Sequence, residues 1–529
     1  MKLKQRIACL ALVLALLCPL AVSCATAETP APTLQTETEE KAETKEDQKE
    51  KETGVSYPCQ IDPDFRDKNL EYKNLSADAL NALPVASEEM TAMERRKLCL
   101  DYFQMQLTFR WQGNLDVTDY QSTYAKTIKD RALLTQNLYA GIPYQSGGNG
   151  NLYRWLEYYD EASGTFDLAR AFGENGGYGE GGDLEDIKRD ADGNMTYKRY
   201  RSMKTFFNAC SSGAGWAWTR VINSADFGAT LDYNVHGGFI PVGCYTYENM
   251  ETVDKLGTVT EGNPKGLDVD DIIEEMGEKK LYECYALMRP ADCLLSGGHT
   301  MMVRRVVVAL KADGSINPQK SCIFILDQGE GWAKKGKMDG KKFYRQGDVD
   351  RLFTFAELKD ANYLPFTFAE LLDENDPFDK PHLDFYKKHI ASRNYLGEKY
   401  AQTELSPEDL KVVCGSGVEK ATVFLTGKPA SLKDLESLSV GSNYPLSDVF
   451  VRVKGADGSV MLENIYRVTG NSTRVVSVNS PMSGEKTDAN GNRPSVLTGV
   501  SAAVAKGGTL EIAVRVSTGE VLFVEGLNF

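Results

Sequence analysis

The sequence predicts an α+β protein in which helices precede an antiparallel sheet and an all-β domain follows it. The first observation is an amphipathic helical segment over residues 87–111, followed further along the chain by three apolar runs with the length of strands. The second is a polar, hairpin-like connection, "KADGSINPQK", between two of those runs, which indicates an antiparallel meander. The third is the region 412–529, where short alternating runs are separated by turn signals such as "GADGS" and "DANGN", a pattern typical of a β-sandwich.

Residues 1–27 have the pattern of an export signal. Three basic residues precede the apolar stretch "IACLALVLALLCPLAV", which is short for a membrane span and is followed by small residues. Two processing routes fit: cleavage after "ATA" at Ala27 gives a secreted protein, whereas the lipobox-like "AVSC" makes Cys24 the lipid-bearing residue. We therefore expect an exported protein, either a lipoprotein anchored on the extracytoplasmic face of a membrane or a secreted protein.

Residues 28–56 are predicted to form a disordered acidic tether. They consist mainly of Thr, Glu, Lys and Pro and contain almost no apolar residues, so they cannot bury a core. After a lipidated cysteine, such a tether would hold the folded part of the chain away from the membrane, which favours the lipoprotein interpretation.

Residues 57–140 are predicted to form a helical N-terminal part. In "SEEMTAMERRKLCLDYFQMQLTFRW", apolar residues recur close to the 3.6-residue period, and Ser87 with the two glutamates after it gives a partial helix start. A second helix is predicted over "DYQSTYAKTIKDRALLTQNLYA", and Gly141 and Pro143 are expected to end it.

Residues 141–376 are predicted to form the main α+β domain. A glycine-rich loop, "GIPYQSGGNGN", comes first, and the polar residues 160–205 are predicted to be a surface insertion. A helix is expected to open at "SSGAGWAWTRVI", and the three predicted strands are "LYECYALM", "HTMMVRRVVVAL" and "SCIFILDQ". The segment "LFTFAELKDANYLPFTFAELL" closes the domain, and a polar, partly helical connector at 377–411 leads to the β-sandwich module at 412–529.

Charge and cysteine usage exclude several classes of site. The formal net charge is −15, from 60 basic and 75 acidic residues, and no basic run stands out, so nucleic acid is not an expected partner. The chain has 11 cysteines but no CxxC or CxxH spacing, so no metal site is predicted, and no organic cofactor is implied. Disulfides are compatible with export, although a buried free thiol is the commoner occupant of apolar runs such as "YECYALM" and "SCIFILD".

The stretch "NACSSGAGWAW" places Cys210 at the predicted start of a helix. A cysteine nucleophile needs a lowered pKa, which the dipole and free amides of a helix N-terminus favour. Ser211 suits the first turn and a contact with substrate, the small residues around it leave room for a substrate backbone, and the amide of Cys210 can donate to an oxyanion. The alternative for Cys210 is a small core residue.

A cysteine nucleophile also needs a general base, and the chain offers four histidines. Three of them lie in a loop or in the polar connector: His236, His382 and His389. His299 follows two glycines and begins a strong strand. If the next strand, "CIFILDQ", pairs antiparallel with it, the last residues of that strand return beside His299 and can orient its ring. Asp327 is preferred for this position because a carboxylate stabilises imidazolium, and Gln328 is the alternative third member.

This order of a cysteine, a histidine and an acid or amide resembles that of papain-like enzymes, and local motifs narrow the resemblance to NlpC-type cell-wall endopeptidases. "YAGIPYQSGG" looks like the "PY..GG" loop of that family, "ACSSG" is similar to its "DCSG" turn, and "MRPADCLLSGGHTMMV" resembles its "kpGDl…GHvgi" segment. The resemblance covers about residues 139–330. The chain departs from the family at Ala209 and Ala291, where the family has aspartate and glycine, and in the long segment between its first two motifs.

The resemblance implies an active site with assigned roles. Cys210 would be the nucleophile, His299 the base, and the acid or amide at the end of the next strand the third member. Tyr144 would line the site near the thiol and contact substrate, and Asp292 would be the structural aspartate of the turn before the histidine strand.

The sequence thus predicts an exported cysteine hydrolase that cleaves amide bonds in the peptide stems of peptidoglycan, typically after D-isoglutamate, as the resembled family does. One alternative is an amidase of the same fold that cuts between sugar and stem peptide. Another is a non-catalytic surface lipoprotein that uses the papain-like domain to bind cell wall. The implied partners are peptidoglycan or peptide and, through Cys24, a membrane. The terminal β-domain contains no histidine and is expected to be a binding or spacer module.

Overall fold

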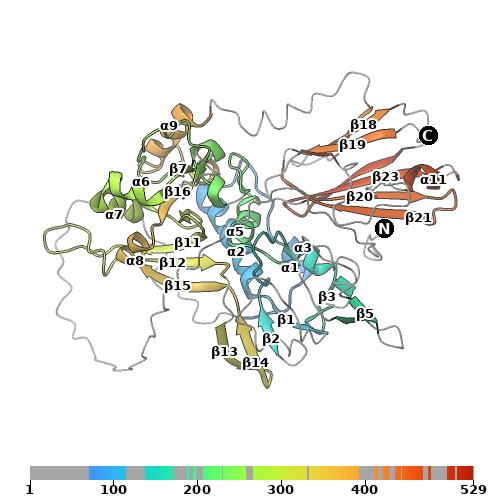
Figure 1. Ribbon diagram of the computed structural model, residues 1–529, viewed down its shortest axis with the longest axis horizontal. Coiled ribbons are helices and arrows are strands. Elements are labelled where there is room, and N and C mark those ends of the chain that lie inside the picture. Colours follow the sequence, from blue (N-terminus) through green and yellow to red (C-terminus); the bar gives the residue numbers. More distant parts are fainter. Residues whose placement is uncertain are drawn as a thin grey trace.

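In the computed structural model, the described part of the chain is a mixed α/β protein with several antiparallel sheets (Figure 1). The structure describes residues 71–114, 137–167, 170–171, 187–189, 195–197, 206–228, 230–257, 266–329, 333–391, 410–414, 421–427, 435–442, 444–468, 475–477, 497, 499–504, 506 and 509–527. The predicted export signal with Cys24, the predicted tether and most of the predicted second helix lie outside these residues, as does most of the predicted insertion.

One six-stranded sheet has the strand order β15-β12-β11-β10-β16-β7. Its strands are β7 (Ile240–Pro241), β10 (Cys293–Leu295), β11 (Thr300–Val307), β12 (Cys322–Asp327), β15 (Asp348–Thr354) and β16 (Leu364–Thr367). All neighbouring strands in it are antiparallel. The strands predicted over the second and third apolar runs are therefore confirmed, and so is their antiparallel pairing.

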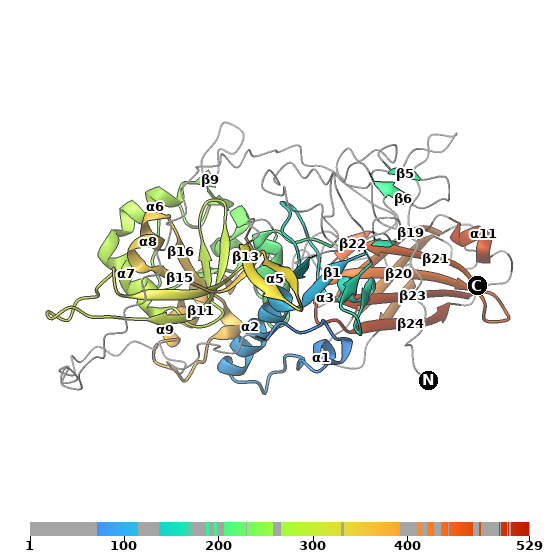
Figure 2. The same ribbon diagram turned by 90° about the horizontal axis from the view of Figure 1, so that it is seen from below.

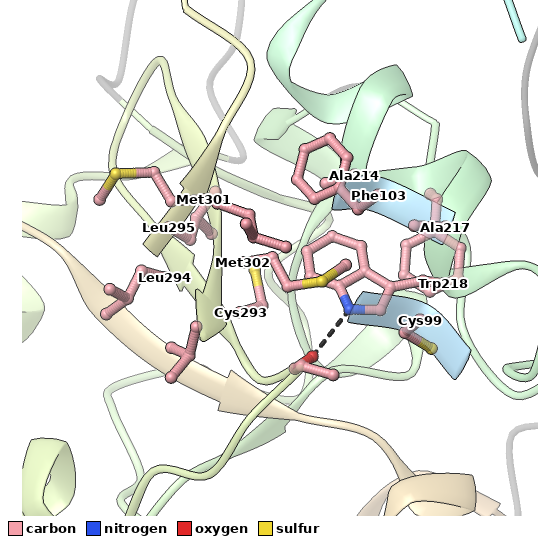
Figure 3. Close-up of a cluster of buried hydrophobic side chains, with 14 of the residues drawn as sticks. Cys99, Phe103, Ala214, Ala217, Trp218, Cys293, Leu294, Leu295, Met301 and Met302 are labelled. Atoms are coloured by element: carbon pink, nitrogen blue, oxygen red, sulfur yellow. Dashed lines mark hydrogen bonds between the residues drawn. The ribbon is translucent and has the colours of Figure 1, made fainter. Parts of the chain in front are cut away.

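Two helices, α2 (Ala92–Thr108) and α5 (Cys210–Trp218), pack against this sheet, and both confirm predicted helices. The start of α2 differs from the prediction, because Thr91 and Glu94 form a reciprocal capping box and Ser87 lies outside the helix. Figure 3 shows side chains of both helices on the same side of the sheet as side chains of β10 and β11: Cys99, Phe103, Ala214, Ala217, Trp218, Cys293, Leu295 and Met302. This packing holds α5 beside the sheet.

The first apolar run, "LYECYALM", is a helix and not the predicted strand. It belongs to α7 (Glu278–Leu287), which follows α6 (Val269–Met276) after a single glycine. Its buried residues Leu281, Cys284 and Tyr285 follow the i, i+3, i+4 spacing that places side chains on one face of a helix. The apolar run therefore covers the core with one helical face instead of entering the sheet.

A second six-stranded sheet has the order β13-β14-β2-β1-β4-β3. Its strands are β1 (Arg110–Gly113), β2 (Leu138–Ala140), β3 (Tyr159–Asp160), β4 (Thr165–Phe166), β13 (Ala333–Met338) and β14 (Lys341–Arg345). The helix predicted up to residue 140 is wrong at its end, because Leu138–Ala140 pairs with β1 on one side and β14 on the other. The two sheets are connected by the chain itself, since β13 and β14 come between β12 and β15.

The C-terminal region contains two four-stranded antiparallel sheets, in the orders β17-β18-β19-β22 and β21-β20-β23-β24. Their strands are β17 (Leu410–Cys414), β18 (Ala421–Gly427), β19 (Leu435–Ser442), β20 (Leu446–Lys454), β21 (Val460–Arg467), β22 (Val475–Ser477), β23 (Thr509–Val516) and β24 (Val521–Leu527). Val440 of β19 packs in one apolar cluster with residues of β20 and β23, so the two sheets share a core. Figure 2 shows this region at one end of the molecule, next to α3 (Leu152–Leu156).

Shorter elements occupy the connections. The described residues also form the helices α1 (Ala77–Asn81), α8 (Phe355–Asp360), α9 (Lys380–His389) and α11 (Val500–Val504), and the 3₁₀ helices η3 (Thr230–Asp232), η4 (Val235–Gly237) and η5 (Ala369–Leu371). Two small sheets pair β5 (Ile187–Arg189) with β6 (Met195–Tyr197) and β8 (Lys255–Leu256) with β9 (Gly266–Leu267). Within the described ranges, no helix has the length and apolar character needed to cross a membrane.

Candidate active site

The predicted nucleophile lies at the start of a helix. Cys210 is the first residue of α5, directly after the N-cap residue Ala209. The Ala209 amide donates to the Ser212 hydroxyl at 2.9 Å, and that hydroxyl donates to the carbonyl of Gly148. The first amides of a helix lack partners within it, so Cys210 lies where backbone donors and the helix dipole favour a negative charge. The residue is only 4% exposed.

The predicted base and its partner meet at the ends of two neighbouring strands. His299 directly precedes β11, and Asp327 is the last residue of β12. Because the strands are antiparallel, with Met302 opposite Leu326, the end of β12 returns beside His299. His299 Nε2 lies 2.7 Å from Asp327 Oδ1. The Asp327 side chain is buried and the imidazole is 27% exposed, so the pair meets solvent on the histidine side.

Gln328, the alternative third member, has other partners. Its Nε2 donates to the carbonyl of Ile142 at 2.8 Å, and its side chain lies close to Gly213 of α5. Of the two candidates, Asp327 is therefore the one that contacts His299. Gln328 instead connects the loop before Tyr144 with α5.

The thiol and the imidazole shift each other's pKa. Burial by itself raises the pKa of Cys210, but the positive charge of His299 and hydrogen bonds from its ring and from the Thr300 backbone outweigh burial and leave this pKa below its usual value. Burial likewise lowers the pKa of His299, yet the charges of Asp327 and of the Cys210 thiolate raise it well above its usual value. The two shifts agree in direction and favour a thiolate–imidazolium pair.

Cys210 differs in its pKa from other thiols of the protein. Six cysteines are free thiols in the described part of the chain: Cys99, Cys210, Cys244, Cys284, Cys293 and Cys322. Burial raises the pKa of Cys284 to about 12 and that of Cys244 to about 11, and the nearby Lys280 does not outweigh it in either case. A thiol with a lowered pKa next to an imidazole is therefore a specific property of the predicted site.

Two residues that no sequence motif marks interact with the thiol or with the imidazole. Thr230 Oγ1 lies 3.8 Å from Cys210 Sγ and accepts a hydrogen bond from the Thr300 hydroxyl at 3.3 Å. The Thr230 hydroxyl can therefore donate its own hydrogen to Cys210 Sγ. Tyr363, just before β16, is buried and interacts electrostatically with His299. Thr230 belongs to η3 and Tyr363 lies just before β16, so tertiary structure and not a local motif brings them to the site.

The glycine-rich loop lies directly against the segment before Cys210. Gln145 donates its amide to the carbonyl of Asn208 at 2.8 Å, and Gly150 donates to that of Phe207 at 2.9 Å. A Cβ on Gly148 would lie 2.3 Å from a backbone oxygen, and a Cβ on Gly150 would lie 2.1 Å from another. Both positions therefore need glycine for close approach of two backbones.

The two residues predicted to contact substrate lie next to the nucleophile segment. Tyr144 forms a single parallel bridge with Asn208, two residues before Cys210, and its amide donates to Gln346 Oε1 at 2.7 Å. Ser211 follows Cys210 in α5, is buried, and accepts a hydrogen bond from the Tyr233 hydroxyl at its carbonyl. Tyr144 is half-buried and lies nearer the surface than Ser211.

Asp292 has structural partners. It accepts hydrogen bonds from Arg96 at 2.7 Å and from the Thr367 hydroxyl at 2.6 Å, and it is 2% exposed. Ala291 before it has a φ of 67°, a left-handed conformation that favours glycine, as the resembled family has there. The Ala291 carbonyl accepts a hydrogen bond from the Trp218 indole at 2.8 Å, the dashed line in Figure 3. The turn before β10 is thus bonded to the end of α5.

The other histidines have partners away from Cys210. His382 accepts the amide hydrogen of Gly243 at Nε2, at 2.8 Å, and its Nδ1 lies 2.9 Å from the carbonyl of Phe378. These bonds require a neutral ring, in agreement with burial, which lowers the pKa of His382. His236 belongs to η4, and His389 lies 3.5 Å from a carboxylate of Glu251.

Comparisons with known proteins leave the site to be interpreted from its own geometry. No protein-family model, no curated protein and no solved structure matches the chain. In the part of the chain that the structure describes, no group of three or more His, Cys, Asp or Glu side chains is arranged to hold a metal ion. What the geometry offers is a thiol at a helix start, an imidazole beside it and a carboxylate bonded to the imidazole.

Proposed function

We propose that this protein is an exported cysteine hydrolase with a papain-like active domain, and that it cleaves amide bonds in the peptide stems of peptidoglycan. The observation that carries the proposal is the 2.7 Å contact between His299 and Asp327, next to a helix-start thiol whose pKa is lowered by the same imidazole. A cysteine that only fills the core would have a raised pKa, as Cys284 does. Perturbed pKa values of this kind are typical of catalytic groups.

The first step is attack of the Cys210 thiolate on the carbonyl carbon of a bound amide. A carbon–sulfur bond forms, and the carbonyl electrons move to oxygen, where the Cys210 amide at the start of α5 can donate a hydrogen bond. The His299 imidazolium then protonates the amide nitrogen, the carbon–nitrogen bond breaks, and the amine leaves an acyl-enzyme. Because Nε2 is bonded to Asp327, Nδ1 is the nitrogen that transfers the proton.

The second step returns the enzyme to its starting state. Neutral His299 takes a proton from water, the resulting hydroxide adds to the thioester, and the carbon–sulfur bond breaks to give a carboxylic acid and the thiolate. Asp327 stabilises the imidazolium and holds the ring in one tautomer. Its other oxygen lies 3.7 Å from Arg351 Nη1, a half-exposed cation that competes for the carboxylate charge.

The proposed substrate class rests on the motifs that resemble NlpC-type enzymes and on the predicted export signal. The glycine-rich loop, which carries the first of those motifs, lies against the segment before Cys210 and so reaches the site. An amidase of the same fold would use the same three side chains on the bond between sugar and stem peptide. The products of the reaction distinguish these two activities.

A non-catalytic role in cell-wall binding is the second candidate function. It is favoured by the burial of Cys210, because a substrate carbonyl has to reach the sulfur of a residue that is 4% exposed. In that case the domain would be part of a surface lipoprotein anchored through Cys24. The thiol would then have no reaction to perform, and its reactivity would not matter to binding.

Digestion of purified peptidoglycan, followed by mass analysis of the released fragments, tests the proposal. We expect the wild-type protein to release fragments cut within the stem peptide, and the folded variant Cys210→Ala to release none. Intact stems freed from sugar would assign the amidase activity instead. If the wild-type protein releases nothing and iodoacetamide modifies Cys210 no faster than the half-buried free thiol Cys244, the hydrolase proposal is wrong.

A further inference from the structure

We infer that the C-terminal β-domain, the two sheets from β17 to β24, is a positioning part of the active site, because it bonds to both the loop and the helix that hold Cys210. The sequence favours a separable binding or spacer module. The structure instead shows two sets of buried contacts between this domain and the nucleophile region. The inference rests on the proposed function, since it gives the β-domain a role in the reactivity of Cys210.

The first contact is made by the turn between β23 and β24. The Ser517 hydroxyl donates at 3.1 Å to the carbonyl of Thr219, the C-cap residue of α5. The carbonyl of Thr518 accepts hydrogen bonds from Arg220, the next residue of the chain, and from the Tyr153 hydroxyl at 2.7 Å. The last carbonyls of a helix lack partners within it. The β-domain therefore supplies a partner to the end of the nucleophile helix.

Gly519 shows how close this contact is. It has a φ of +90°, and a Cβ on it would lie 2.0 Å from the ring of Tyr153 in α3. Any side chain at this position would both strain the turn and push the two parts of the protein apart.

The second contact joins the β-domain to the glycine-rich loop. Asn149 Nδ2 donates to the carbonyl of Val468 at 3.3 Å, and Asn151 Nδ2 donates to the Ser447 hydroxyl at 3.0 Å. Arg154 Nη2 donates to the main-chain carbonyl of Ser447 at 2.7 Å and to that of Val468 at 3.0 Å. All three donor residues are buried. One end of the β20–β21 pair thus binds the loop and the start of α3.

The other side of the same loop holds the start of α5. The carbonyl of Gly148 accepts the amide hydrogen of Ala209 at 3.2 Å and the hydroxyl hydrogen of Ser212. Asn149, the next residue, is the one bonded to the β-domain. Both bonds end on the Gly148 carbonyl, on either side of Cys210 in the chain, so a shift of the loop is transmitted to the start of α5.

A group of charged side chains, the interface cluster, closes the boundary between the two parts. It consists of Arg154 and Glu157 from the α3 region and Asp448, Arg467 and Arg515 from the β-domain. Glu157 pairs with Arg467 at 2.6 Å and Arg515 at 2.9 Å, and Asp448 pairs with all three arginines at 3.0–3.1 Å. No side chain in it is more than 11% exposed. Three of the five pairs cross the boundary, those of Glu157 with Arg467 and Arg515 and that of Arg154 with Asp448, so separation of the domains would break them.

Two glycine-to-alanine variants in the full chain test the inference. Gly519→Ala places a methyl group against Tyr153, whereas Gly458→Ala changes a glycine at φ +78° in the β20–β21 turn, where a Cβ would meet no atom within 4 Å. Both variants strain a turn of the same domain, but only the first also disturbs the contact with α3. The measurement is the rate of Cys210 modification by iodoacetamide across pH, assigned by mass spectrometry, at a temperature where each variant is folded.

We expect the Cys210 rate to fall about tenfold in Gly519→Ala, with a pH profile closer to that of an ordinary thiol, because small misplacements in catalytic sites are costly. Gly458→Ala should keep the wild-type rate and profile. An unchanged Cys210 modification rate in Gly519→Ala, or an equal fall of that rate in both variants, would overturn the inference. If Gly519→Ala does not fold, Ser517→Ala takes its place. A Cys210 modification rate in Ser517→Ala equal to that in Gly458→Ala would then overturn the inference. Failure of the proposed function would give a different result, because Cys210 of the wild-type protein would itself react with iodoacetamide no faster than Cys244.

Discussion

The interface cluster and the candidate catalytic group bury charge in different ways. In the interface cluster, each carboxylate is paired with at least two arginines, and arginine does not release its proton in proteins. In the catalytic group, Cys210 and His299 both titrate, and the imidazole is 27% exposed. Complete pairing of buried charges gives a rigid contact, whereas a pair that exchanges a proton beside solvent gives a reactive one.

The pKa directions express the same difference. Burial raises the pKa of Asp448, but three surrounding arginines outweigh burial and hold this pKa well below its usual value. The charge of Asp448 is therefore fixed at any pH near neutral. Burial also raises the pKa of Cys210, and what outweighs it is chiefly a histidine, whose own charge depends on pH.

The largest expected effect separates Asp327 from Gln328 in the catalytic group. Asp327→Asn should lower hydrolysis about 10²-fold or more, because an amide neither stabilises imidazolium nor secures the tautomer. Gln328→Ala, next to it in the chain, removes a bond to the Ile142 carbonyl and should leave the base in place. Initial rates of fragment release measure both. Equal losses in the two variants would contradict the assignment of Asp327 as the partner of His299.

A large effect on stability is expected in the interface cluster. Asp448→Ala should cost about 3–5 kcal/mol of unfolding free energy, because it leaves buried arginines without their shared carboxylate. Glu463→Ala is the matched control, since Glu463 pairs with Arg452 on the same two strands, partly exposed and away from the interface. We expect it to cost about 1 kcal/mol or less. Denaturant unfolding measures both, and similar values would show that the cluster is not a stabilising contact.

The smallest expected effect concerns the exposed side of the catalytic group. Arg351 is 52% exposed and is the arginine that lies 3.7 Å from Asp327. Arg351→Ala removes a cation that competes for the Asp327 charge, so the pKa of His299 should rise further. The alkaline limb of the pH–rate profile should then move to higher pH, by about half a unit or less for so exposed a pair. A move to lower pH would show that Arg351 acts in another way.

The parts of the fold that sequence predicts correctly are those with a strong local period. The helix α2 and the strands β11 and β12 have one regular apolar pattern each, and their structure follows it. The run in α7 is too short for its apolar pattern to separate strand from helix, although Leu281, Cys284, Tyr285 and Met288 repeat with helical spacing. The cap at Thr91 also had a local signal, the sequence Thr-x-x-Glu, in place of the predicted Ser87.

The candidate site shows the same division. Cys210, His299 and Asp327 each stand at the end of a regular element, so their places could be predicted from helix and strand patterns. Thr230 and Tyr363 carry no such signal, because they reach the site only through tertiary structure, Thr230 from η3 and Tyr363 from the residue before β16. The bonds from the β-domain to Asn149 and Thr219 likewise join residues more than two hundred and ninety positions apart. No local pattern specifies contacts of that range.

The most direct measurement is the pH dependence of the rate at which iodoacetamide modifies Cys210 in the wild-type protein, with Cys244 as the internal reference. A thiolate–imidazolium pair keeps Cys210 reactive as the pH falls from about 9 to about 6, because its pKa is lowered while that of His299 is raised. Cys244, with a pKa raised to about 11, should lose about tenfold in rate per pH unit over the same range. If the Cys210 rate falls in parallel with that of Cys244, the thiol is not activated and the candidate active site is not one.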